Sequence, residues 1–446
     1  MLFRKYLFPP FFPGAPSFDH NLNMYFWIFF IWIFILIYEG LYTKRLTFWD
    51  EVKLLWKCTF FATLTIMTIL FIGQQSALFS RTIIVTMAFC SLLIFPVLRI
   101  NLKKVLFALG FLKRKLLIVG AGDAGKLALS AINHEPDLGY EVTGFIDDDP
   151  TLPSKVNGLK VHCGINQIHR YIKRCGIHDI LVAKPELDKD ALTKIIGKIQ
   201  HTVENTLFVP DLPDIAVLGT ELRHFFRDQT IVIEIKNNLA KPVNYIVKRL
   251  FDFIVGFLFL SVLTLPLLII YLLIRLTSPG PAIFKQERIG KYGRPFVCYK
   301  FRTMRQDAEQ ILQNILEKDQ IAKRQWGEYR KLIDDPRITR VGKFLRETSL
   351  DELPQIFNVM RGDMSLIGPR PVTKEEIEKH YQDMSQLYLS VPPGITGLWQ
   401  VSGRSDSSYE QRISLDSWYV RNWNLWLDIM ILFKTIKVVL KKQGAR

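Results

Sequence analysis

The sequence predicts a membrane α/β protein built from three parts. Transmembrane helices occupy residues 1–112, and a Rossmann-like parallel α/β domain occupies residues 113–240. A re-entrant membrane helix and a small, mainly helical, monotopic domain fill residues 241–446. Three observations support this division. Hydrophobic residues make up 49% of the 446 residues and gather in blocks. A glycine-rich turn follows a short apolar strand pattern, and closely spaced acidic and basic motifs mark the C-terminal part.

Three N-terminal apolar segments are close to the ~20 residues needed to cross a bilayer core. They run from about Met24 to Tyr38, Leu54 to Ile72 and Thr82 to Leu98. Basic residues lie between the first two segments and follow the third, whereas the loop between the second and third carries only Arg81. The positive-inside rule therefore places the first loop, and everything after Leu98, in the cytoplasm.

The net charge of +16 raises the question of an anionic partner. Much of the positive charge lies beside apolar blocks, which favours lipid headgroups and phosphorylated ligands and argues against a nucleic-acid partner. The five cysteines form no close ligand or disulfide spacing. We interpret them as scattered reduced thiols of a chain that faces the cytoplasm.

A fourth apolar run, Phe253–Leu273, has basic residues at both flanks and Pro266 inside. Proline removes a backbone hydrogen bond and favours a bend. A straight span would put the flanking domains on opposite sides of the membrane. The charge pattern instead predicts a re-entrant helix, about residues 248–276, that breaks near Pro266 and returns to the same face. A spanning helix that tolerates its proline is the alternative.

The middle domain carries a pattern typical of dinucleotide binding. An apolar strand pattern, Lys115–Gly120, leads into a glycine turn and a helix, and a second strand, Glu141–Ile146, ends in an acidic residue. The glycines would let the backbone approach a pyrophosphate, and the acid could reach a ribose hydroxyl. The candidate nucleotide-binding residues are Gly120, Gly122, Gly125 and Asp147.

Three later apolar segments, Ile180–Ala183, Thr206–Val209 and Ile231–Ile235, are expected to continue the sheet. Redox catalysis in this domain is disfavoured. A short-chain oxidoreductase or epimerase would use a Tyr-x-x-x-Lys pair, and no tyrosine of the chain has one; Tyr245 is followed at that spacing by Arg249. A structural or dimerising role and nucleotide sensing both stay open.

Two adjacent carboxylates, Asp351 and Glu352, stand at the start of a predicted helix. One interpretation is local, because Ser349 and Glu352 have the spacing of a capping box and acids suit a helix N-terminus. The other is phosphate chemistry at a membrane surface, since basic segments lie on either side. The nearby Gly362–Pro371 segment is hard to explain by capping. It holds Arg370 between two prolines, which indicates a cation fixed in place.

Basic and aromatic residues alternate within Phe284–Arg288 and Lys300–Met304. On a strand this alternation would turn the cations to one side. The functional interpretation is a phosphate clamp, for which arginine offers bidentate geometry; a solvated basic face beside anionic lipid is the alternative. The candidate phosphate-binding residues are Lys300, Arg302, Arg337, Arg346, Arg370 and Arg404.

From about Lys241 to the C-terminus the chain resembles the bacterial sugar transferase family, the monotopic phosphoglycosyl transferases. The N-terminal spans and the glycine-turn domain are similar to the large members of that family. Two departures stand out: Leu265 precedes Pro266 where members commonly have serine, and an additional N-terminal span is not recognisable. The motifs that carry the resemblance are Lys248–Asp252, Leu276–Pro281, Lys300–Met304, Leu350–Gln355, Gly362–Pro371 and Pro393–Arg404.

The resemblance implies a multi-pass enzyme of the bacterial cytoplasmic (inner) membrane, with its catalytic domain on the cytoplasmic face. It would transfer hexose-1-phosphate from a UDP-sugar to undecaprenyl phosphate and release UMP, which initiates surface polysaccharide assembly. UDP-galactose is the expected donor and UDP-glucose the next. Asp351 would attack the donor, and Glu352 would hold Mg²⁺. Inner-membrane lipids and a second copy of the chain are further expected partners. The competing hypotheses are a membrane-bound sugar-nucleotide oxidoreductase or epimerase and a noncatalytic nucleotide-sensing scaffold.

Overall fold

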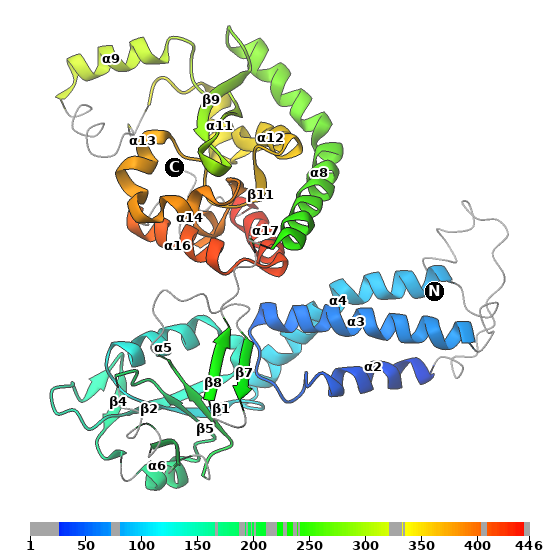
Figure 1. Cartoon of the computed structure of the whole chain (residues 1–446), viewed down its shortest axis with the longest axis vertical. Coiled ribbons are helices and arrows are strands. Elements are labelled where there is room, and N and C mark those ends of the chain that lie inside the picture. Colours follow the sequence, from blue (N-terminus) through cyan, green and yellow to red (C-terminus); the bar gives the residue numbers. More distant parts are fainter. Residues whose placement is uncertain are drawn as a thin grey trace. The chain divides into compact units, whose positions relative to one another are not determined.

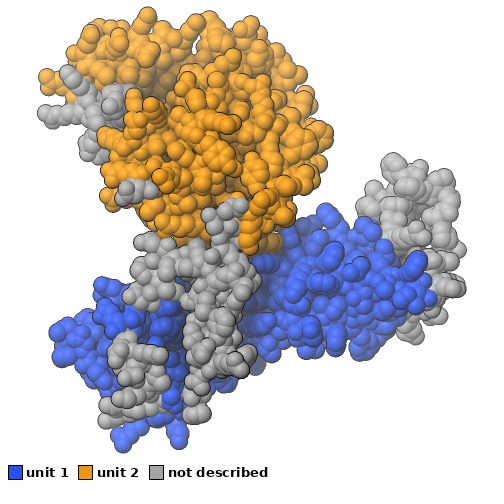
Figure 2. Space-filling view, in the orientation of Figure 1, with its two compact units in different colours: residues 1–212 blue, residues 213–446 orange. Residues whose placement is uncertain are grey.

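A computed structural model gives the fold (Figure 1). Its contacts divide the chain into two compact units, residues 1–212 and 213–446, which are described separately below (Figure 2). The structure describes residues 26–72, 81–165, 168–186, 192, 195–197, 199, 202–210, 221–225, 230–234, 239, 241–320, 332, 335–402 and 408–440.

Three apolar helices open the first unit: α2 (Phe26–Tyr38), α3 (Phe48–Ile72) and α4 (Arg81–Ala108). Both α3 and α4 are long and apolar enough to cross a membrane, whereas the described part of the first predicted segment is a shorter apolar helix of 13 residues. The helices pack on one another through a shared apolar core that includes Trp32 and Ile66. Much of their remaining surface is apolar and exposed, as expected for helices in lipid.

Polar contacts tie one end of these helices to the domain that follows. Glu51 of α3 pairs with Arg99 and Lys103 of α4. Arg45, in the loop between α2 and α3, donates hydrogen bonds to the backbone oxygens of Leu138 (2.6 Å) and Leu112 (2.8 Å). The loop and the α/β domain are therefore in direct contact, and their place on the cytoplasmic side of the membrane stays a prediction.

The α/β domain has a six-stranded sheet in the order β3-β4-β2-β1-β5-β6. The five strands β4, β2, β1, β5 and β6 are parallel to one another, in the order typical of a Rossmann half, and β3 pairs antiparallel to β4. Alternate residues of β1 enter two different apolar cores, so both faces of the sheet are covered. The predicted parallel α/β domain is confirmed. Its elements are β1 (Arg114–Val119), α5 (Asp123–His134), η3 (Pro136–Leu138), β2 (Tyr140–Ile146), β3 (Lys155–Val156), β4 (Leu159–His162), α6 (Ile168–Cys175), β5 (Asp179–Val182) and β6 (Asn205–Phe208).

One sheet prediction is wrong. The segment Ile231–Ile235 does not continue the parallel sheet, because β8 (Thr230–Glu234) pairs antiparallel with β7 (Glu221–Phe225) in a sheet of two strands. Only residues 226–229 separate the two strands. So short a connection joins antiparallel neighbours, whereas a parallel partner needs a crossover of about a dozen residues or more.

The membrane helix of the second unit, α8 (Pro242–Thr277), is 36 residues long and stays helical through Pro266. The predicted break is therefore absent, and the helix curves instead (Figure 1). Both halves pack on the same domain: Asp252 accepts a hydrogen bond from Ser365, and Ile274 packs with Phe301. Re-entry through one membrane face stays a prediction, and contact of both helix ends with one domain supports it.

The rest of the second unit is a small, mainly helical domain around short strand pairs. By the division above, the β7–β8 pair belongs to this unit as well, and a β9–β10 hairpin and a parallel β11–β12 pair are the sheet elements of the domain that follows α8. Its main core joins α8, α12, α16 and α17 through residues such as Val359, Tyr419 and Trp423. The elements are β9 (Ile283–Ile289), η6 (Lys291–Gly293), β10 (Pro295–Phe301), α9 (Ala308–Lys318), α11 (Arg340–Glu347), η7 (Leu350–Gln355), α12 (Ile356–Arg361), β11 (Ser365–Ile367), α13 (Lys374–Glu376), η8 (Ile377–Tyr381), η9 (Gln382–Met384), α14 (Ser385–Leu389), β12 (Gly394–Thr396), α15 (Leu398–Ser402), α16 (Tyr409–Arg421) and α17 (Leu425–Leu440).

Candidate active site

The two candidate carboxylates lie in η7, a single six-residue 3₁₀ segment between α11 and α12. The chain enters it through Ser349, whose φ of +56° lies in the left-handed region. That conformation is uncommon for a residue other than glycine, and such backbone strain is often held at functional sites. Ser349 makes no capping hydrogen bond to η7. The capping-box interpretation of Ser349 and Glu352 is therefore wrong.

Glu352 instead lies between two cations. It accepts a hydrogen bond from Lys300 Nζ at 2.8 Å, and Arg370 Nη2 is 3.9 Å from the same oxygen. Lys300 comes from the end of β10, and Arg370 follows β11. Arg370 is 36% exposed, and its guanidinium carbon lies 5.8 Å from the centroid of the Trp399 ring. Three segments that are distant in sequence thus bring one carboxylate and two cations together.

Asp351 is the more unusual of the two acids. Burial raises the pKa of its carboxyl to about 6, and the negative charge of Glu352 adds to the effect. The cations Lys300 and Arg346 oppose the rise. At neutral pH the side chain is mostly ionised, although the fold disfavours that charge. Such a carboxylate suits nucleophilic or acid–base chemistry better than it suits a structural ion pair.

Arg346 reaches this site from α11. Its Nε donates to Thr303 Oγ1 at 2.9 Å, which fixes the guanidinium close to Asp351. The close approach of α11 depends on Gly342, because a Cβ there would lie 2.0 Å from the backbone oxygen of Thr303. Burial lowers the pKa of Arg346, and the charge of Asp351 opposes that shift. Arg346 remains a cation close to Asp351.

Two other predicted phosphate-binding residues, Arg302 and Arg337, have protein partners of their own. Arg302 donates to the backbone oxygens of Pro279 (2.6 Å) and Ser278 (2.9 Å), so its terminal nitrogens hold the turn after α8. Arg337 pairs with Asp335 through two contacts of 2.7 and 2.6 Å. These two arginines therefore have structural partners. Arg404 lies outside the described residues.

In the candidate nucleotide site of the α/β domain, the acidic residue already has partners within the protein. Asp147 is 2% exposed and accepts hydrogen bonds from the backbone amides of Ala121 and Asp149 and from Lys184 Nζ. Burial alone would raise the pKa of Asp147, but these contacts, led by Lys184, lower it. Both carboxylate oxygens are engaged within the protein. A contact from Asp147 to a ribose hydroxyl stays a prediction.

The three glycines of the turn have distinct roles. Gly120 has φ +107°, and a Cβ there would lie 2.5 Å from the oxygen of Ala183. A Cβ on Gly125 would lie 2.1 Å from the oxygen of Gly120. Close approach of the chain after β5 accounts for Gly120, and tight packing of α5 on the end of β1 accounts for Gly125. At Gly122 nothing lies within 4 Å, so only this glycine faces open space.

Comparison with known proteins gives a family match in each of the two units. A family model described as bacterial sugar transferase matches residues 243–442, and one described as a CoA-binding domain matches residues 37–210. The undecaprenyl-phosphate galactose phosphotransferase of Salmonella typhimurium is 40% identical over 408 residues, which are 91% of this chain and 84% of that protein. The chain belongs to the bacterial sugar transferase family.

Two further relatives of this sugar transferase differ in the sugar that they are named for. The UDP-galactose-lipid carrier transferase of Erwinia amylovora is 36% identical over 91% of this chain and 84% of its own length. The UDP-glucose:undecaprenyl-phosphate glucose-1-phosphate transferase of Klebsiella pneumoniae is 34% identical over 74% of this chain and 68% of its own length.

Behind Arg370 the sugar transferase has a cluster that sequence reasoning missed. Tyr388 donates to the backbone oxygen of Arg370 at 2.9 Å, and the guanidinium of Arg412 lies 4.8 Å from the Trp399 ring. Burial raises the pKa of Asp416, which faces Arg412, to about 7. Only Trp399 lies in a motif noticed beforehand; the tyrosine, Arg412 and Asp416 come from helices without a recognisable pattern.

A magnesium ion would have to share its ligands with the substrate. Among the described residues, no group of three or more histidine, cysteine, aspartate or glutamate side chains is arranged to hold a metal. Mg²⁺ commonly takes only one or two protein carboxylates and completes its shell with phosphates and water. The Asp351–Glu352 pair fits that donor set.

Proposed function

We propose that this sugar transferase moves hexose-1-phosphate from a UDP-sugar to undecaprenyl phosphate, releases UMP and so initiates surface polysaccharide assembly. The names of the Salmonella and Klebsiella relatives support the lipid acceptor and the sugar-phosphate reaction. The observation that carries the proposal is the state of Asp351, a half-buried carboxylate with a raised pKa beside Lys300 and Arg346. An anionic donor needs such cations, and a covalent route needs such a carboxylate.

In the first step a carboxylate oxygen of Asp351 attacks the β-phosphorus of the donor. A phosphorus–oxygen bond forms to Asp351, and the bond from the β-phosphorus to the bridging oxygen breaks. UMP leaves with that oxygen and its electron pair, and the sugar phosphate stays on the enzyme as an acyl phosphate. Cations close to the leaving group stabilise the charge that develops there.

In the second step a phosphate oxygen of undecaprenyl phosphate attacks the same phosphorus. The bond to Asp351 breaks, its carboxylate is restored, and the product is a lipid diphosphate that carries the hexose. Two half-reactions remove the need to hold two anionic substrates together in one site. Because every bond formed replaces one broken at phosphorus, the cycle needs no oxidant, reductant or external proton.

The remaining site residues position and neutralise phosphate. Arg370, about one-third exposed and carried on a rigid Pro-Arg-Pro segment, is the best placed for a direct phosphate contact. Arg346 lies next to Asp351, where it would stabilise charge on the attacked group. Lys300 holds Glu352 in place. Glu352, with Asp351, would hold Mg²⁺, which when bound offsets negative charge on the phosphoryl oxygens.

Galactose is the sugar that we propose. Two relatives that match 91% of the chain are named for galactose, whereas the Klebsiella relative, which is named for glucose, matches 74%. Purified protein would be incubated with undecaprenyl phosphate and a panel of UDP-sugars while UMP is followed. We expect UDP-galactose to give the highest kcat/KM. A higher value for UDP-glucose would reassign the sugar and leave the reaction class intact.

The covalent intermediate has a direct test. Protein mixed with UDP-galactose alone should gain the mass of one hexose phosphate and release about one equivalent of UMP. The added mass should disappear when undecaprenyl phosphate follows. An unchanged mass, under conditions in which the complete reaction proceeds, would rule out the aspartyl intermediate.

We also propose that the catalytic unit faces the cytoplasm at the bacterial inner membrane and that α8 enters and leaves by that face. Single cysteines would be placed at Asn244 and Thr277, at the two ends of α8, and labelled with an impermeant thiol reagent. Both should react only when the cytoplasmic side is open. Labelling from opposite sides would exclude re-entry.

A further inference from the structure

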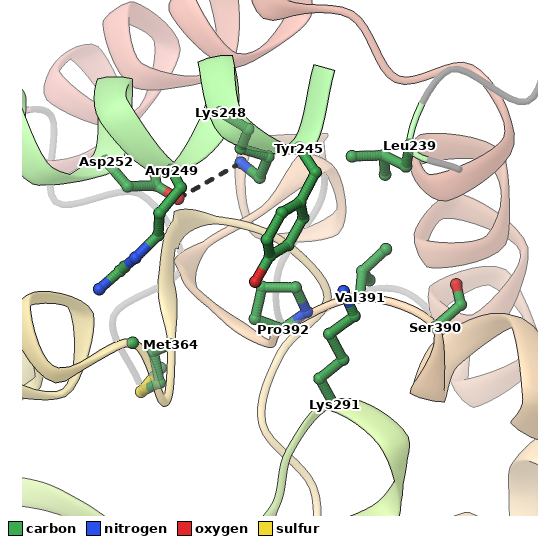
Figure 3. Close-up of a pocket in the computed structure, with 11 residues that line it drawn as sticks. Leu239, Tyr245, Lys248, Arg249, Asp252, Lys291, Met364, Ser390, Val391 and Pro392 are labelled. Carbon is green, nitrogen blue, oxygen red and sulfur yellow. Dashed lines mark ion pairs between the residues drawn. The ribbon is translucent and has the colours of Figure 1, made fainter. Parts of the chain in front are cut away.

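A pocket beside the first turns of α8 contains none of the residues at the Asp351 site (Figure 3). Tyr245 extends from α8 into the pocket, and Lys291 approaches it from the turn between β9 and β10. Gly362 and Met364 follow α12 and line another wall, whereas Asp351 precedes that helix. The pocket is therefore separate from the candidate active site.

Two of the charged residues in this wall are already matched by partners. Lys248 donates to Asp428 at 2.8 Å and to the backbone oxygen of Ile367 at 3.0 Å. Asp252 accepts from Ser365 Oγ at 2.7 Å, and the backbone amide of Leu366 donates to it at 3.1 Å. This buried network joins α8 to α17 and β11, so it contributes structure rather than a free charge to the pocket.

Lys291 is different. Its ammonium lies 4.0 Å from the centroid of the Tyr245 ring and 4.7 Å from that of Tyr292. Within the described part of the chain no carboxylate forms an ion pair with it. Aromatic faces attract a cation but leave its N–H donors without a lone pair to bind. The arrangement holds the ammonium at the pocket and leaves it able to donate to an anionic ligand.

A second positive charge nearby is also uncompensated. The guanidinium of Arg249 donates to the backbone oxygens of Val359 (2.7 Å) and Met360 (3.2 Å) at the end of α12. These acceptors are neutral overall, so they fix the side chain without cancelling its charge. Asp252 and Asp428 together offset two of the three cations Lys248, Arg249 and Lys291, so the charged groups at this pocket still sum to one positive charge.

The exposed side chains around the pocket indicate whether its anionic ligand is a lipid or a soluble molecule. On the same turns of α8, the apolar side chains of Val243, Ile246 and Leu250 are exposed, by 69% in the case of Val243. Tyr292, at the tip of the hairpin, is 70% exposed. Tyrosines and basic side chains beside an exposed apolar helix are typical of the headgroup level of a membrane. A ligand at this depth is a lipid rather than a soluble metabolite.

We propose that this pocket binds the phosphate of an anionic membrane phospholipid, with Lys291 as its direct contact. Tyr245 and Tyr292 hold the ammonium in place, and Arg249 adds attraction at a distance. The site would fix the N-terminal end of α8 in the leaflet, and it is independent of the proposed sugar transfer. A single lysine near an anionic lipid surface contributes roughly 1 kcal/mol, which is about a five-fold change in affinity.

The test uses the full chain in detergent, titrated with phosphatidylglycerol or phosphatidylcholine and followed by native mass spectrometry. We expect tighter binding of phosphatidylglycerol, weakened about five-fold in K291Q. The matched control is K285Q, which makes the same charge change on β9 outside the pocket. K291R and Y245F should bind as the unaltered chain does, whereas Y245L should bind more weakly because the aromatic face is lost.

Three results would overturn the proposal. Equal losses in K291Q and K285Q would indicate a general charge effect. Equal binding of the two lipids, which both carry a phosphate, would indicate no preference for an anionic headgroup. A raised KM for undecaprenyl phosphate in K291Q, with unchanged phosphatidylglycerol binding, would assign the pocket to the acceptor. If K291Q does not fold, phosphatidylglycerol binding is compared between Y245L and Y245F instead. These lipid titrations need neither a UDP-sugar nor turnover. A negative result can therefore be distinguished from failure of the proposed sugar transfer.

Discussion

Two aspartates, one in each unit, show how the same side chain acquires opposite properties. Asp147 ends a strand and is surrounded by two backbone amides and Lys184, which lower its pKa. Asp351 is half-buried beside a second carboxylate, and its pKa is raised to about 6. Hydrogen-bond donors stabilise the charged form of Asp147, whereas burial and the charge of Glu352 disfavour the charged form of Asp351. This difference separates an acid that maintains a fold from one that can react.

The largest expected effect is the loss of the reactive carboxylate. D351N should lower UMP release by on the order of 10⁴-fold or more, because an amide oxygen is a poor nucleophile toward phosphorus. UMP release would be measured in the absence of undecaprenyl phosphate, so that only the first half-reaction is followed.

The matched control for D351N is D147N, which makes the same change at the other aspartate. Folded D147N should release UMP at a rate within about two-fold of the unaltered chain. Comparable losses in both variants would show that activity depends on the α/β domain as well, and the contrast between the two acids would fail.

Arginines give the next contrast, since Arg370 is open to a ligand and Arg302 is occupied by backbone oxygens. R370Q should lower kcat/KM by about 10²- to 10³-fold, the usual cost of losing one donor to developing charge. Its melting temperature should stay close to that of the unaltered chain. R302Q should do the reverse, with a lower melting temperature and a smaller catalytic loss in the protein that remains folded.

A stability change is expected from D147N. The substitution leaves Lys184 without its partner, and loss of one member of a buried pair costs about 2–4 kcal/mol. Because the folded-state pKa of Asp147 is lowered, its contribution is present above the ordinary aspartate pKa and is lost as pH falls. Thermal melting of the detergent-solubilised chain at pH 7 and pH 4 would measure both effects. D149N is the control, since Asp149 is exposed.

The sequence predicted the parts of the site that depend on short segments. Lys300, Glu352 and Arg370 lie in three motifs noticed beforehand, and the structure brings them together. The spacing of Ser349 and Glu352 suggested a cap, but a left-handed residue at Ser349 and the hydrogen bond from Lys300 give a different arrangement. Local spacing could not indicate a partner 52 residues away.

Contacts between residues that are distant in sequence also explain the other differences between prediction and structure. The glycine pattern around Gly120 predicted the turn and the parallel sheet, yet the state of Asp147 depends on Lys184, which is 37 residues further along the chain. Alternation placed Arg302 on a strand face but could not reveal that the turn after α8 presents two backbone oxygens to it. Packing on one domain keeps α8 helical through Pro266, a tertiary effect that no local rule contains.

The smallest predicted effect is a pH dependence of the first half-reaction. The attacking group is the carboxylate, so the rate should follow the ionised fraction of Asp351 and rise with pH toward a plateau above about 7. With a pKa of about 6, roughly one-tenth of the side chains are ionised at pH 5, and the rate there should be about ten-fold below the plateau.

Leaving undecaprenyl phosphate out of this measurement matters, because a phosphate monoester itself titrates near pH 6 and would imitate the same curve. The pre-steady-state burst of UMP from UDP-galactose alone removes that ambiguity. A burst rate that stays constant from pH 5 to pH 7 would mean that Asp351 is ionised throughout. It would then be stabilised as well as Asp147 is, and the contrast between the two acids would have to rest on access to the donor instead of on charge.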